Sequence, residues 1–228
     1  MTTRLQPHDV ARPRVATREH RTPNTTKGGL GSPGVCSGDA TLQIWIFDDS
    51  GSVTGVGGTD PVAQRYREAR TALRHVARAC SCGVERVGIL HFDADKDRVR
   101  PTRIGGLGEL WLQRGLQVPI GAQGTSDLLA ALQVAEEWAD QASDGTSVQL
   151  VVFSDFALTD DDPDDVIRRM ESFSGEVTAC VLGPGIWPGA DSRVRVRHVA
   201  SSVGRWSFAR AVLGELTHDR PGAGVRRM

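Results

Sequence analysis

Short apolar runs alternate with amphipathic helical segments along most of the chain, and this alternation is the feature that most constrains the fold. Residues 42–47, 87–92 and 148–153 are nearly continuous apolar runs, as is typical of strands covered on both faces. In the segment 62–80, apolar side chains recur at steps of three and four residues, which indicates an amphipathic helix. The pattern predicts an α/β fold with a Rossmann-like, mostly parallel sheet and helices on both faces.

Weaker signals complete this architecture. Asp60 and Pro61 form an N-cap and first-turn proline pair that predicts a helix start, and Gly83 predicts its end. Other helices are expected at 128–139, from 163 to 170 and at 206–216, and strands at 176–182 and 194–199. The segment 101–123 interrupts the alternation, and we expect residues 111–118 to supply one short edge strand.

Length and charge restrict the chain to one domain of ordinary composition. It has 228 residues, with 27 Lys and Arg against 28 Asp and Glu. Balanced charge argues against a nucleic-acid partner, and no apolar run or leader indicates a membrane span or a secretory signal. We expect a cytoplasmic protein with a proline-rich, disordered or extended tail (1–39), one domain (40–217) and a flexible C-terminus (218–228).

The four cysteines predict neither a disulfide nor a zinc framework. Cys80 and Cys82 are separated by one residue, but Cys36 and Cys180 lie far from them in the sequence. No second close pair of cysteines and no histidine has the spacing of a zinc ligand. We therefore expect four reduced thiols.

Oxygen donors follow the buried strands, at the edge of the sheet where ligands of such folds bind. They come from three loops: Asp48, Ser50 and Ser52; Thr125 and Ser126; and Asp155. Carboxylates and hydroxyls without imidazole or thiolate suit Mg²⁺ or Mn²⁺. Two aspartates neutralise such an ion, which readily keeps a coordination position open for an incoming carboxylate.

These loops resemble the metal-ion-dependent adhesion site of the von Willebrand factor A family. Asp48, Ser50 and Ser52 match its Asp-x-Ser-x-Ser motif, and Asp155 matches the aspartate after a later strand. In the third loop, residue type favours Thr125, whereas alignment on the following Asp-Leu favours Ser126. The resemblance covers about residues 41–217.

The resemblance implies a non-catalytic protein-binding module of the intracellular bacterial type. Through a divalent metal it would capture an aspartate or glutamate of a partner protein. The resemblance also implies where such a partner belongs, namely in a complex with an ATPase or in a stress or signalling assembly.

Other interpretations stay open at this stage. The three loops could simply bond to nearby backbone and cap a helix, which would leave a metal-free scaffold of the same fold. Asp93 and Asp95 resemble the site of haloacid dehalogenase-like phosphatases, although no lysine follows Lys96. Trp187, on a glycine- and proline-rich loop, is either a partner-binding anchor or a cover for the sheet.

Overall fold

A computed structural model describes residues 29–60, 62–80, 82–92, 98–119, 124–199 and 206–225. Its main sheet has six strands in the order β4-β3-β2-β5-β6-β7. All neighbouring pairs are parallel except β3 and β4. The strands are β2 (Thr41–Phe47), β3 (Glu85–His91), β4 (Val99–Arg103), β5 (Ser147–Ser154), β6 (Glu176–Leu182) and β7 (Val194–Val199).

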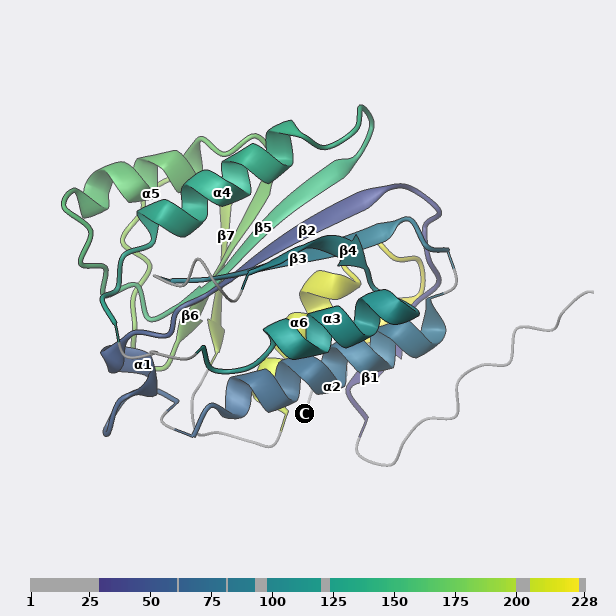
Figure 1. The fold of residues 1–228 in the computed structure, drawn as a ribbon, viewed down its shortest axis with the longest axis horizontal. Coiled ribbons are helices and arrows are strands. Elements are labelled where there is room, and N and C mark those ends of the chain that lie inside the picture. The colour runs from purple at the N-terminus through teal and green to yellow at the C-terminus, as the bar shows by residue number, and fades with distance from the viewer. Residues whose placement is uncertain are drawn as a thin grey trace, which may run out of the picture.

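Helices cover both faces of this sheet, as the alternation predicts (Figure 1). One face carries α2 (Gln64–Ala79), α3 (Leu107–Gly115) and α6 (Ser207–Leu216), and the other carries α4 (Leu129–Asp140) and α5 (Pro163–Glu171). The short helix α1 (Gly51–Thr54) lies directly beyond the carboxyl end of β2. The predicted fold class is therefore confirmed.

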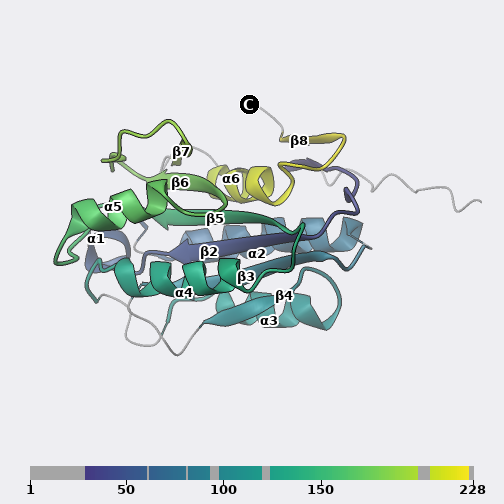
Figure 2. The ribbon, with the colours of Figure 1, turned by 90° about the horizontal axis from the view of Figure 1, so that it is seen from above.

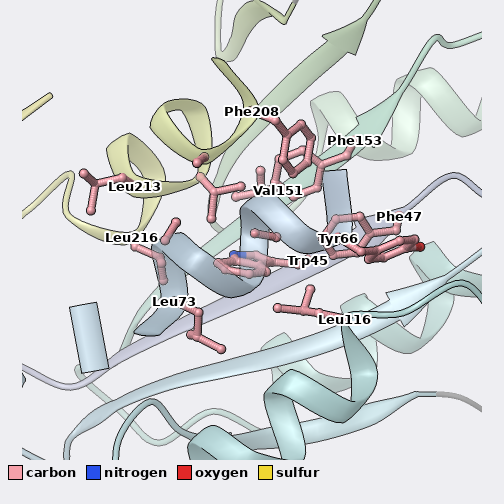
Figure 3. Packing of buried hydrophobic residues seen from close by; sticks show 14 of the residues in the cluster. Trp45, Phe47, Tyr66, Leu73, Leu116, Val151, Phe153, Phe208, Leu213 and Leu216 are labelled. Atoms are coloured by element: carbon pink, nitrogen blue, oxygen red, sulfur yellow. The ribbon is translucent and has the colours of Figure 1, made fainter. Parts of the chain in front are cut away.

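The alternation of side chains along β2 explains why the sheet is covered on both faces. Trp45 and Phe47 join the apolar cluster under α2 and α6, whereas Ile44 and Ile46 join the cluster under α4 and α5. In the first cluster Phe47 stacks on Phe153 with ring centroids 4.8 Å apart (Figure 3). Buried aromatic packing thus fixes the ends of β2 and β5, the strands from which two of the candidate loops leave.

The expected edge strand at 111–118 is wrong in its position. The edge strand is β4, antiparallel to β3, while residues 107–115 form helix α3. Leu112 and Leu116 are fully buried one helical turn apart, whereas Trp111 stays 58% exposed. Helical packing on one face thus decides the conformation of a segment whose apolar residues are too few to show a clear period.

Two short strands lie outside the expected domain limits of 40 and 217. Strand β1 (Gly31–Pro33) pairs antiparallel with β8 (Ala223–Val225), which joins the two ends of the described chain (Figure 2).

A second difference concerns the start of helix α2, which begins at Gln64 rather than directly after Asp60. The Asp60 carboxylate still caps the helix, because it accepts hydrogen bonds from the Gln64 and Arg65 N–H groups. Of the helices in the described ranges, none has the length and apolar character to cross a membrane.

Candidate functional site

The first candidate loop leaves the sheet between two paired strands. Phe47, the last residue of β2, lies beside Phe153 of β5, and the Asp48 N–H donates to the Phe153 carbonyl at 2.9 Å. The chain then enters α1, which has Ser50 as its N-cap and contains Ser52. The loops of β2 and β5 consequently start side by side, as the parallel topology requires.

Asp48 is a fully buried carboxylate without a cationic partner among its described contacts. Its Oδ1 accepts the Ser50 N–H at 2.9 Å, and its Oδ2 accepts the Ser154 hydroxyl at 2.6 Å. Burial raises the pKa of Asp48 above its usual value, although these hydrogen bonds oppose the shift and the charge of Asp155 adds to it. The ionised carboxylate is therefore costly in this position, and a cation beside it would lower that cost.

Two hydroxyls beside Asp48 have the spacing of metal ligands. Ser50 Oγ and Ser52 Oγ are 3.0 Å apart and share a hydrogen bond. In an octahedral magnesium site with bonds of 2.0–2.1 Å, neighbouring ligand oxygens are about 2.9 Å apart. Ser50 is buried and Ser52 is exposed, so the pair lies at the boundary between protein and solvent.

The third loop is connected to the Asp155 loop through Thr159. The Ser126 N–H donates to Thr159 Oγ1 at 2.8 Å, and the Ser126 carbonyl accepts from the Thr159 N–H. Ser126 is buried, whereas Thr125 is exposed and its hydroxyl donates to Asp127 at 2.7 Å. The expected N-cap role of the 124–127 segment falls instead to Asp160, whose carboxylate accepts the Leu128 and Leu129 N–H groups.

Asp155 is held in place by an unusual backbone and a close neighbour. Phe156, which follows it, is buried at a φ of 58°, a conformation that non-glycine residues rarely adopt and that is frequent at functional sites. A Cβ on Gly185 would lie 2.3 Å from the Asp155 carbonyl oxygen. The loop after β6 therefore packs directly against the backbone of Asp155, and glycine at 185 permits this approach.

That same loop carries Trp187, whose indole ring is half-buried. It packs edge-on against Phe156 with ring centroids 5.0 Å apart, next to the apolar cluster under α4 and α5. Its neighbour Ile186 is 77% exposed. The loop thus covers the end of the sheet and exposes an apolar side chain directly after the glycine that touches the Asp155 backbone.

A buried ionic network that the sequence pattern does not predict lies next to Asp48. The Asp49 carboxylate accepts hydrogen bonds from Arg65 at 2.5 Å and from Tyr66 at 2.7 Å, and it contacts His91 Nδ1 at 2.8 Å. The other nitrogen of His91 faces the Gly115 carbonyl at 3.0 Å, so both ring nitrogens have buried polar partners. Arg65 also donates to the Asp48 carbonyl at 3.1 Å.

This network fixes the Asp48 loop to three elements of the fold. Burial and the Asp49 charge raise the pKa of Tyr66 well above its usual value, so its hydroxyl stays protonated as a donor. The pKa of Arg65 is also raised, since the charges and hydrogen bonds around it outweigh its burial. The available signal was His91 within an apolar strand and Arg65 beside the buried face of a helix.

The described donors fit a hard divalent cation. The buried Asp48 carboxylate lies next to the Ser50 and Ser52 hydroxyls and is close enough to feel the charge of Asp155. Ser126 and Thr125 lie on the loop that Thr159 ties to the Asp155 loop. Oxygen donors of this kind select Mg²⁺ or Mn²⁺ over zinc or copper. Asp93 and Asp95, the residues of the alternative phosphatase hypothesis, lie outside the described residues.

Comparisons with known proteins place the fold. No protein-family model and no curated protein matches the chain. Among solved structures, the pilus adhesin SpaC from Lactobacillus rhamnosus GG matches with a TM-score of 0.61 at 12% identity, over 83% of this chain and 31% of the adhesin. A von Willebrand factor type A protein from Catenulispora acidiphila matches with a TM-score of 0.52 at 13% identity, over 78% of this chain and 42% of that protein.

A third match covers a whole solved chain. The conserved hypothetical protein BatB from Bacteroides thetaiotaomicron has a TM-score of 0.53 at 13% identity, and the match covers 79% of this chain and 100% of BatB. The present chain, by contrast, spans only 31% of the adhesin. At such identities the likeness shows the fold, which is that of von Willebrand factor A-like proteins.

Proposed function

We propose that this chain is a non-catalytic protein-binding module that captures an acidic residue of a partner through a divalent metal held at the Asp48 edge of the sheet. The observation that carries the proposal is the buried Asp48 carboxylate, which has no cation among its described contacts and lies next to the hydrogen-bonded Ser50 and Ser52 hydroxyls. Binding domains of this fold support it, since one matched protein is named a pilus adhesin.

Each residue has a distinct role in the proposed site. Asp48 and Asp155 supply the negative charge, and Ser50 and Ser52 supply neutral ligand oxygens. When bound, Mg²⁺ or Mn²⁺ supplies an electron-poor position that accepts a carboxylate from the partner. The exposure of Ser52 leaves the site accessible from solvent.

For the third loop we assign Ser126 rather than Thr125 as the ligand. The Thr125 hydroxyl donates to the Asp127 carboxylate, and its side chain is exposed. Ser126 is buried where the third loop joins the Asp155 loop through Thr159. This choice agrees with the alignment on the following Asp-Leu.

The partner surface extends, in this proposal, to the loop after β6. Ile186 is exposed, and Gly185 of the same loop touches the Asp155 backbone, so an apolar contact would lie next to the metal. Trp187, which packs against Phe156, would hold this loop in position. We also propose a cytoplasmic location and a partner in an ATPase, stress or signalling complex.

Two measurements test the function. Calorimetric titration of the full chain with Mg²⁺ and Mn²⁺ should show binding that Asp48→Ala abolishes and Asp144→Ala, an exposed control, leaves intact. A pull-down from native lysate should then capture a partner in Mg²⁺ but not in EDTA, and only with the wild type and the control variant. Absence of metal binding would establish the metal-free scaffold instead, and turnover of a phosphate ester abolished by Asp93→Asn would establish the phosphatase.

A further inference from the structure

Three cysteines and a glutamate gather at the opposite end of the sheet from Asp48. Cys36 lies between β1 and β2, and Cys80 follows the last residue of α2. Cys82 precedes β3, and Glu85 is the first residue of that strand. Strand β2 has seven residues, so the two ends of the sheet are roughly 20 Å apart. This cluster is therefore independent of the site proposed above.

The ligand atoms of the cluster lie within 4.8 Å of one another. Cys80 Sγ is 3.3 Å from Cys36 Sγ, 3.4 Å from Cys82 Sγ and 3.2 Å from Glu85 Oε2. In a tetrahedral zinc site with bonds of 2.3 Å to sulfur, neighbouring sulfurs are about 3.8 Å apart. The two observed sulfur–sulfur separations are far too long for a disulfide and need to expand by only about 0.4–0.5 Å to surround an ion.

Backbone N–H groups and neighbouring thiols form hydrogen bonds with the Cys82 sulfur. Burial raises the pKa of this thiol, but the N–H groups of Val84 and Glu85 and the thiols of Cys36 and Cys80 lower it by more. The pKa of Cys82 is consequently below its usual value, while burial and the neighbouring acceptors raise that of Cys80. A sulfur that accepts backbone N–H groups in this way is suited to a metal site, because hydrogen bonds to ligand atoms are typical of such sites.

Glu85 is oriented by a buried arginine. Arg220 Nε donates to Glu85 Oε1 at 2.9 Å, its terminal nitrogen contacts Oε2, and it also donates to the Pro33 carbonyl. Both side chains are at most 6% exposed. A carboxylate held in this way by a second residue is typical of metal ligands, and its pairing with a cation offsets the charge of a site rich in thiolates.

We infer that Cys36, Cys80 and Cys82 bind a structural Zn²⁺ ion, with Glu85 as the fourth ligand. Three sulfurs and one oxygen in a closed, four-coordinate arrangement suit Zn²⁺, because soft thiolates select it over Mg²⁺ and the carboxylate disfavours Cu⁺. The ion would connect the segment after β1, the end of α2 and the start of β3. It would thereby fasten the β1–β8 pair, through Arg220, to the main sheet.

Metal analysis and cobalt substitution of the full chain test this site. Protein purified under reducing conditions should carry about one zinc per chain. Replacement of zinc by Co²⁺ should give thiolate-to-cobalt charge-transfer absorption and the intense visible bands of tetrahedral cobalt. Cys36→Ser and Cys82→Ser should abolish tight zinc binding, while Cys36→His should retain a tetrahedral spectrum with roughly one third less charge transfer, since one of three sulfurs is lost.

Two controls separate this site from the rest of the molecule. Cys180→Ala removes the buried cysteine outside the cluster, and Asp48→Ala removes the other proposed metal site, so both variants should keep the cobalt spectrum. Circular dichroism checks that each serine variant is folded. If Cys36→Ser does not fold, the cobalt spectrum of Cys36→His still tests whether residue 36 is a ligand. A chain without zinc, a cobalt spectrum without charge transfer, or a disulfide between Cys36 and Cys80 found by mass spectrometry would each overturn the inference.

Discussion

The Ser154 hydroxyl donates a hydrogen bond of 2.6 Å to Oδ2 of Asp48, which connects the last residue of β5 to the first residue after β2. The same Ser154 oxygen accepts the Phe156 N–H at 2.8 Å. One hydroxyl thus orients a proposed metal ligand and also fixes the turn that carries Asp155. Its effect on metal binding is therefore open to direct measurement.

Ser154→Ala should weaken Mn²⁺ binding without unfolding the chain. Loss of a residue that orients a metal ligand typically costs about 10–100-fold in affinity, and we expect the lower part of this range because the Ser50 N–H still holds Oδ1. Calorimetric titration measures the change. Ser147→Ala, at the other end of the same strand, is the matched control, and equal affinities for the two variants would contradict the role given to Ser154.

Asp48→Asn should stabilise the metal-free protein and remove its response to metal. Burial makes the ionised carboxylate costly to the fold, and the isosteric amide can still accept a hydrogen bond. A gain of about 1 kcal/mol corresponds to a melting temperature roughly 2–4 °C higher for a chain of this size. Thermal melts in EDTA and in Mg²⁺ check both parts: only the wild type should gain stability from Mg²⁺, and a variant that melts below the wild type in EDTA would contradict the argument.

The buried network at Asp49 should contribute to stability more than to metal chemistry. Asp49→Ala removes the carboxylate that Arg65 and His91 share, although Arg65 keeps Asp60 and His91 keeps the Gly115 carbonyl as partners. Breaking a buried ion pair costs about 3–5 kcal/mol, and we expect the lower part of this range because of these remaining partners. Tyr66→Phe removes one donor only and should cost about 1–2 kcal/mol. Urea unfolding measures the free energy of unfolding of both variants. A smaller loss of stability for Asp49→Ala than for Tyr66→Phe would contradict the central role given to the Asp49 carboxylate.

The fold and the first candidate loop could be predicted from the sequence because their signals are local. The apolar runs give strands β2, β3 and β5, and parallel topology brings Asp48 next to the β5 loop whatever the details of packing. The edge strand was misplaced because β4 is largely polar and has no fully buried residue, so its sequence carries no apolar strand signal. Leu112 and Leu116 show a helical face only once it is known what they cover.

Contacts between distant residues could not be predicted in the same way. The Thr159 and Asp160 bonds to the 126–129 segment span more than thirty residues, and Cys36 meets Cys80 across forty-four. Cysteine spacing therefore predicted no zinc framework, because spacing rules detect ligands that are close in sequence. The structure brings Cys36 to Cys80 and Cys82 by pairing β2 with β3.

Ser126→Ala should reduce metal affinity more than Thr125→Ala. If Ser126 supplies a ligand oxygen, its loss should cost roughly tenfold or more in Mn²⁺ affinity. Loss of the Thr125 hydroxyl removes a hydrogen bond to the Asp127 carboxylate, which still accepts from Thr159. Titration of the two variants under one set of conditions distinguishes the assignments, and the reverse order of affinities would make Thr125 the ligand.

Gly185→Ala should disturb Asp155 although residue 185 is not a ligand. A Cβ at 185 would lie 2.3 Å from the Asp155 carbonyl oxygen and 2.8 Å from its Cα, so the backbone of one loop has to move. Because Phe156 already holds a left-handed conformation, the Asp155 turn has little room to adjust. We expect Mn²⁺ affinity to fall roughly tenfold, as for loss of other groups that position ligands.

Gly51→Ala is the control for this prediction. Residue 51 lies between Ser50 and Ser52, yet a Cβ added there would meet no atom within 4 Å. Unchanged affinity in Gly185→Ala, or an equal loss in Gly51→Ala, would remove the loop after β6 from the proposed metal site.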